Sequence, residues 1–135
     1  MSGPWLMSEG EYEGKPIVVR LNAGLAPLAA SGTYPFQAGI AVRLNAPDER
    51  GFPSAEDSAA LGRFEDEFVE ALCGDTSVVF AAVLTTGGMR EFVFYASDEA
   101  LLRERFRAWA ATPKSHRVQL MVRRDPRWAT YRALT

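Results

Sequence analysis

Two residues of this sequence have side chains suited to nucleophilic and base chemistry, and each of these residue types occurs only once. They are Cys73 and His116. Attack by a thiolate needs a base within hydrogen-bonding distance and usually a third group that orients the base. Cys73 falls at the end of a predicted helix, where the helix dipole disfavours a thiolate. We therefore interpret Cys73 as an incidental cysteine and His116 as a solvated loop residue.

Two other patterns are reminiscent of chemistry but are better explained by structure. The acidic run of Glu65, Asp66 and Glu67 with Glu70 predicts a solvated helix face, because neighbouring helical positions point in different directions. The pair Gly87-Gly88 joins two predicted strands, whereas phosphate-binding glycine loops precede a helix. The sequence therefore predicts no catalytic residue, no metal ligands and no cofactor.

Charge is distributed unevenly along the chain. Residues 114–135 carry six basic side chains and one acidic one, while residues 54–73 carry six acidic side chains and one arginine. The basic segment could form an arginine patch for phosphates, nucleic acid or an acidic partner, with Trp128 and Tyr131 available for stacking. Alternatively, the arginines pair internally with the acidic helix or Glu91 while Trp128 and Tyr131 complete the core. We favour the internal interpretation, because most charge runs solvate a face of the fold.

The strongest structural signal is a β-hairpin over residues 77–96. Two runs of β-branched and aromatic residues are joined through Gly87-Gly88, which supply the positive φ angles of a tight hairpin turn. The runs contain no proline and few charges, so both strands are predicted to be central in a sheet.

Alternation of apolar residues predicts further strands over residues 15–22, 36–45 and 117–123. Apolar residues at helical spacing predict one helix from Ser54, its N-cap, to Gly74, and another capped by Ser97 or Asp98 and ended by Pro113. The motif Asp125-Pro126 predicts a short terminal helical turn. Residues 5–7 form a small apolar cluster ahead of an acidic link, and residues 23–33 read as a loop.

These elements give the order ββαββαβ plus a short C-terminal helical turn. With 135 residues, 47% of them hydrophobic, the chain predicts a single α+β domain over residues 1–135. The economical packing is a ferredoxin-like sandwich, a mainly antiparallel sheet with two helices on one face. The other face is then expected to carry a mixed set of residues: Arg20, Gln37, Arg43, Glu91, Tyr95, Arg117, Gln119 and Arg123 with Val18, Val83, Val93 and Met121.

Several motifs together carry a family resemblance. They are the run TGGMREFVFY at residues 86–95, the pattern D-x-x-W-x-x-Y at residues 125–131, GFP at residues 51–53 and Trp5. Over nearly its whole length the chain resembles a bacterial family of uncharacterised domains, a domain of unknown function sometimes found beside domains similar to the protein regulator B of ribonuclease E. The resemblance implies a compact α+β domain without established chemistry and, by neighbourhood, an association with RNA processing.

The composition also limits the cellular location and the partners that we expect for this protein. A net charge of −2 argues against a protein that coats nucleic acid, and one cysteine excludes an internal disulfide. We find no signal peptide and no apolar run of about 20 residues that would cross a membrane, so we expect a cytoplasmic protein.

We expect a non-catalytic binding or regulatory module, an adaptor for a protein partner. The residues expected to bind the ligand or partner are Arg20, Arg43, Arg90, Tyr95, Arg117 and Arg123. The mixed sheet face is also suited to a homodimer contact. An alternative is an enzyme or sensor for a small anionic metabolite, in a cleft between Arg43, Arg90, Tyr95 and residues 45–53. A third hypothesis is single-stranded nucleic-acid binding, ranked last because Tyr95 is the main aromatic residue of the face.

Overall fold

The computed structural model describes residues 4–135 as one six-stranded antiparallel sheet with helices on both faces. The strand order across the sheet is β1-β2-β4-β5-β3-β6. The strands are β1 (Trp5–Tyr12), β2 (Lys15–Asn22), β3 (Phe36–Arg43), β4 (Val78–Thr86), β5 (Met89–Ala96) and β6 (Val118–Arg124). The helices are α1 (Ala26–Ala29), preceded by a 3₁₀ turn (Ala23–Leu25), α2 (Ala55–Leu72), α3 (Glu99–Trp109) and α4 (Ala129–Ala133). The predicted α+β class is confirmed.

The central hairpin β4–β5 forms as the sequence predicts. Its two strands are the third and fourth of the six, so neither is an edge. Gly87 and Gly88 have φ angles of 57° and 83°, and Thr86 pairs with Met89 across the turn. These left-handed angles twist the turn in the sense that the flanking strands require.

The predicted order ββαββαβ and its ferredoxin-like arrangement differ from the observed strand order and helix count. Strand β1 is the main omission, because its residues pair with β2 over the whole length from Trp5 to Tyr12. It is an edge strand, exposed at nearly every position and rich in acidic residues, so it shows no alternation of buried and exposed side chains. The part of the chain from β3 to β6 keeps the predicted alternation of strands and helices.

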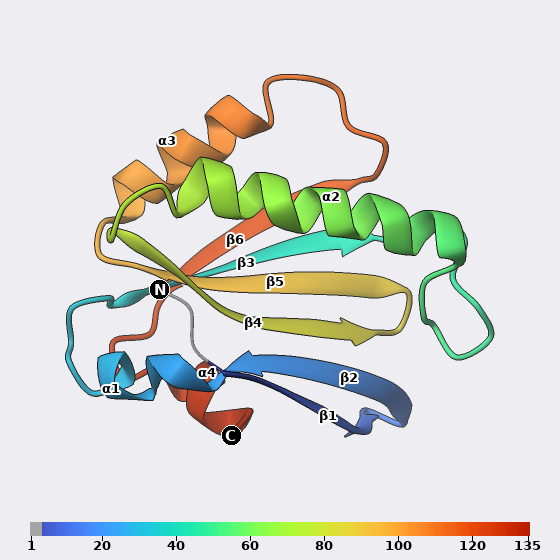
Figure 1. The fold of residues 1–135 in the computed structure, drawn as a ribbon, viewed down its shortest axis with the longest axis horizontal. Helices are drawn as coiled ribbons and strands as arrows, with labels where there is room; N and C mark the ends of the chain where they lie inside the picture. Colours follow the sequence, from blue (N-terminus) through green and yellow to red (C-terminus); the bar gives the residue numbers. More distant parts are fainter. Residues whose placement is uncertain (1–3) are drawn as a thin grey trace.

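Helices α2 and α3 cover one face of the sheet (Figure 1). Both begin at the predicted caps: the side chain of Ser54 accepts the backbone N–H of Asp57, and that of Asp98 accepts the N–H of Leu101. The helices close a first core whose buried aromatic members are Phe64, Phe68, Phe92 and Phe94.

The sequence led us to expect that the opposite face is open along its whole length. Part of this face is covered instead. Helices α1 and α4 pack on it and close a second core, seen at the bottom of Figure 1. This core contains Leu21, Leu25, Ala29, Tyr34, Val79, Ala81, Ala82, Val93, Tyr95, Trp128 and Tyr131. The short terminal helical turn predicted from Asp125-Pro126 corresponds to α4, which begins at Ala129 with Trp128 as its N-cap. Helix α1 was not predicted, because four residues are too few for a periodic pattern to reveal it.

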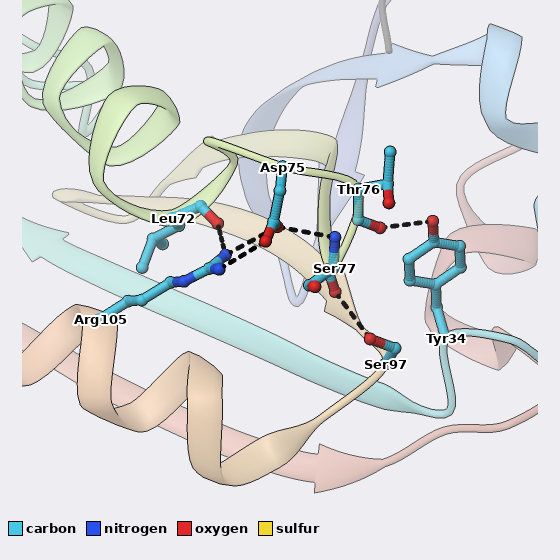
Figure 2. Close-up of polar contacts among 7 residues, drawn as sticks. All are labelled: Tyr34, Leu72, Asp75, Thr76, Ser77, Ser97 and Arg105. Atoms are coloured by element: carbon cyan, nitrogen blue, oxygen red, sulfur yellow. Dashed lines mark hydrogen bonds and ion pairs between the residues drawn. The ribbon is translucent and has the colours of Figure 1, made fainter.

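A polar clamp fixes the connection between α2 and β4 (Figure 2). Arg105 of α3 donates two hydrogen bonds to the carboxylate of Asp75, at 3.0 and 2.8 Å, and one to the carbonyl of Leu72 at the end of α2. The same carboxylate accepts the backbone N–H of Ser77. The guanidinium of Arg105 and the N–H of Ser77 hold the pKa of Asp75 well below its usual range. The clamp therefore joins the two helices to the start of the central hairpin.

Candidate functional site

The structure divides the six predicted binding residues between the two faces of the sheet. Arg20 and Arg90 lie on the face covered by α2, where Arg20 forms an ion pair with Glu65. The Nε atom of Arg90 donates to the hydroxyl of Thr85 at 2.8 Å. These two arginines therefore do not share a surface with the other four residues, and the predicted grouping is wrong.

Tyr95 is on the expected face but lies inside the second core. Its ring stacks on Trp128 with centroids 3.9 Å apart, and its hydroxyl donates to Asp125 at 2.7 Å. Burial and the neighbouring carboxylate raise the pKa of Tyr95 well above its usual range. The expected cleft between Arg43, Arg90, Tyr95 and residues 45–53 is therefore not formed.

The remaining three arginines do gather on one uncovered surface. Arg43 and Arg117 lie directly opposite each other, because the N–H of Arg43 donates to the carbonyl of Arg117 at the end of the β3–β6 ladder. Arg123 lies further along β6, opposite Gln37. We define the open half-sheet as the part of this face not covered by α1 and α4: Ala41, Arg43, Met89, Glu91, Arg117, Gln119, Met121 and Arg123.

Two methionines give the open half-sheet an apolar component. Met121 is 64% exposed and Met89 is 43% exposed, whereas most large apolar side chains of this domain are buried. Exposed methionines are flexible, polarisable contacts that suit recognition surfaces. The open half-sheet thus combines apolar and cationic groups on the surface of an antiparallel sheet.

A small pocket lies where the open half-sheet meets α4, with a volume of about 210 Å³. Its lining consists of Gln37, Gly39, Glu91, Met121, Val122, Arg123 and Thr130, and we refer to it as the Glu91 pocket. Glu91 extends from β5 across β3, and its Oε2 would lie 2.2 Å from a β-carbon placed on Gly39. Glycine at residue 39 therefore leaves the space in which the carboxylate lies. Sequence reasoning placed Glu91 on this face but had no means of recognising the pocket.

Arg123 is held at the rim of the pocket by two hydrogen bonds. Its Nε donates to the side-chain oxygen of Gln37 at 2.7 Å, and its Nη2 donates to the hydroxyl of Thr130 in α4. The planar guanidinium is thereby fixed in orientation.

A second polar cluster surrounds His116. The sequence predicted a solvated loop residue here, but His116 is buried. Its Nε2 lies 2.7 Å from Oδ1 of Asp57, and its Nδ1 lies 2.9 Å from the hydroxyl of Ser115. Asp57 also accepts the backbone N–H groups of Asn45 and Ala46. Burial alone would raise the pKa of Asp57, but these hydrogen bonds outweigh it and lower the pKa.

The Asp57 cluster has the contacts of a structural joint. Asp57 lies in the first turn of α2, while its partners belong to the loop after β3 and to the segment before β6. An ionised Asp57 requires His116 to donate from Nε2, and Nδ1 is then left to the hydroxyl of Ser115, which can either donate to it or accept from it. Each polar group of the cluster thus has a partner, and the cluster joins three segments that are distant in sequence.

Other predicted features behave as ordinary structure. Burial raises the pKa of the Cys73 thiol to about 12, which makes it unreactive. Trp128 and Tyr131 complete the second core, as the internal interpretation of the basic segment predicts. The other half of that interpretation is wrong: among residues 4–135, no arginine of the basic segment forms an ion pair with the acidic helix or with Glu91. Among residues 4–135, no group of three histidine, cysteine or acidic residues is placed to hold a metal ion. In the same part of the chain, no helix has the length and apolar character needed to cross a membrane.

The sheet and its two helical layers define an α+β domain, and comparison of sequences then identifies the family. Residues 4–134 match the family of unknown function DUF695, and the chain belongs to that family. The resemblance inferred from the hairpin and from D-x-x-W-x-x-Y is confirmed in this respect. Searches of curated proteins and of solved structures gave no match.

Proposed function

We propose that this domain is a non-catalytic binding module, and that its binding surface is the open half-sheet. The observation that supports this most is the placement of Arg43, Arg117 and Arg123 on the same uncovered sheet surface as two exposed methionines. Arginine and methionine are both enriched in protein interfaces. In this proposal the domain acts as an adaptor or regulatory domain through this surface.

The charge of the surface indicates the chemistry of the partner. Arg43 and Arg117 are like charges directly opposite each other on neighbouring strands, an arrangement that destabilises a sheet. Carboxylates of a partner would remove this repulsion and accept bidentate hydrogen bonds from the guanidinium groups. The proposed partner is therefore an acidic segment of another protein.

The two competing hypotheses have less support. The metabolite cleft required Arg43, Arg90 and Tyr95 to converge, and they lie on different faces or in the core. Single-stranded nucleic acid is usually bound by stacking on exposed aromatic rings, and Tyr95 is fully buried.

The proposal is tested by reversing charge on the surface. We expect Arg43→Glu/Arg117→Glu to weaken binding of an acidic partner at least about 100-fold, because like charges then face each other across the interface. The control is Arg103→Glu/Arg107→Glu, which makes the same change of charge on exposed residues of α3. The tagged variants are used to capture proteins from the cell lysate with nuclease present, and the affinity of each retained protein is then measured by calorimetry.

The result can contradict the proposal in three ways. An open half-sheet variant that retains every partner would show that the surface is not used. Capture of nucleic acid alone, in a parallel experiment without nuclease, would favour the nucleic-acid hypothesis. Loss of self-association alone, seen as a change from dimer to monomer in gel filtration, would identify the surface as a homodimer contact.

A further inference from the structure

Two opposite charges line the Glu91 pocket without forming an ion pair. Among residues 4–135, the carboxylate of Glu91 has no hydrogen-bond donor and no cation within ion-pair distance. Arg123 is near enough to act on it electrostatically but remains bound to Gln37 and Thr130. A half-buried carboxylate normally recruits a donor, because leaving it without one costs free energy.

The partial burial of Glu91 disfavours its charged form. Burial raises the pKa of Glu91, and the positive charge of Arg123 only partly opposes this effect. On the other side of the pocket, Arg123 has its Nε and Nη2 occupied, and its Nη1 has no partner among the described residues. One acceptor and one donor of opposite charge are therefore available, separated by a space.

The space between them has the size and lining of a small-molecule site. Its volume of about 210 Å³ exceeds what one or two water molecules need. Gly39 gives it a floor without a side chain, while Met121 supplies an apolar wall. Polar groups at two ends of a partly apolar pocket are the usual arrangement for orienting a small ligand.

We propose that the Glu91 pocket binds the zwitterionic head of a free α-amino acid, with the ammonium group on Glu91 and the carboxylate on Arg123. A cation alone would be repelled by Arg123, and an anion alone by Glu91. A neutral ligand would leave both charges without a counter-charge. This inference rests on the proposed binding role of the open half-sheet, and it adds a small ligand that would bind within the same surface.

The proposal is tested by titrating ¹⁵N-labelled protein with glycine, L-alanine and L-leucine and recording the backbone amide resonances. We expect saturable shifts at Gly39, Glu91 and Met121, with a dissociation constant on the order of 1 mM, as is reasonable for so small a ligand. Ethylammonium and propionate, which carry one charge each, are expected to bind at least about tenfold more weakly than L-alanine. Equal binding of a singly charged compound, or no binding by any of the three amino acids, would overturn the proposal.

Two variants and a control locate the binding. Glu91→Gln keeps the shape of the side chain but removes the charge, and we expect at least about tenfold weaker binding. Gly39→Ala places a methyl group where the Glu91 carboxylate lies and is expected to weaken binding by moving it. Glu104→Gln, on the exposed side of α3, should bind as the wild type does. If Glu91→Gln binds as tightly as the wild type, the inference is wrong.

Failure of this inference can be distinguished from failure of the proposed function. Arg43 and Arg117 do not line the Glu91 pocket, so their charge reversal should leave amino-acid binding within about threefold of the wild type, since only exposed and screened charges change. Loss of a protein partner without amino-acid binding would support the binding surface and reject the pocket. Amino-acid binding with no acidic partner would support the pocket and reject the proposed protein-binding surface.

Discussion

Replacing Trp128 by alanine is expected to lower the free energy of unfolding by about 3–5 kcal/mol, the usual cost of removing a large buried aromatic side chain. Only 1% of Trp128 is exposed, and its ring stacks on Tyr95. Its indole N–H donates to the carbonyl of Tyr34 at 2.9 Å. The variant would lose both the packing and this hydrogen bond, while the backbone at residue 128 would keep its unfavourable φ of 55°.

Urea denaturation measured by circular dichroism checks this prediction. Trp128→Phe is the matched variant, because it keeps an aromatic ring in the second core and loses the indole N–H and part of the ring volume. We expect it to cost roughly 1–2 kcal/mol, in line with one buried hydrogen bond and a smaller ring. A loss below about 1 kcal/mol for Trp128→Ala would show that the second core contributes little to stability.

The same residues explain the D-x-x-W-x-x-Y motif in physical terms. The carboxylate of Asp125 accepts the N–H groups of Ala129 and Thr130 at the start of α4, and also the hydroxyl of Tyr95. The hydroxyl of Tyr131 donates to the carbonyl of Asn22 at the end of β2. The motif therefore closes the second core and attaches α4 to the sheet, which is a structural role.

Replacing Asp57 by asparagine is expected to cost about 3–5 kcal/mol at neutral pH, as for other buried, multiply bonded carboxylates. The N–H groups of Asn45 and Ala46 and the Nε2 of His116 would lose their charged acceptor. The amide of asparagine also brings N–H donors of its own into a site that is already filled with donors. The joint between α2, the loop after β3 and the segment before β6 should loosen.

The difference in stability between wild type and Asp57→Asn should depend on pH. The folded protein lowers the pKa of Asp57, so its contribution is fully present above the unfolded value of about 3.9. As the pH falls below that value toward the folded pKa, the unfolded chain takes up the proton more readily, and the contribution is lost. Urea denaturation between pH 7 and pH 2.5 measures this difference. A difference that stays constant over the whole range would contradict the assignment of Asp57 as an ionised, bonded carboxylate.

Much of the fold follows from local signals in the sequence. The apolar runs and Gly87-Gly88 determined the central hairpin, and alternation determined most of β2, β3 and β6. Ser54 and Asp98 marked the beginnings of the two long helices. These features depend on near neighbours in the chain, so patterns over a few residues are sufficient to reveal them.

The tertiary structure alone decided which face each side chain occupies and which residues meet. Arg20 alternates correctly along β2, but only the pairing of β2 with β4 placed it beneath α2 instead of beside Arg123. His116 lies far from Asp57 in sequence and reads as a loop residue until α2 and the segment before β6 come together. The Glu91 pocket likewise requires β5, β3 and β6 to be adjacent with Gly39 at the centre. Such sites arise from contacts between distant residues, and local sequence patterns carry no information about those contacts.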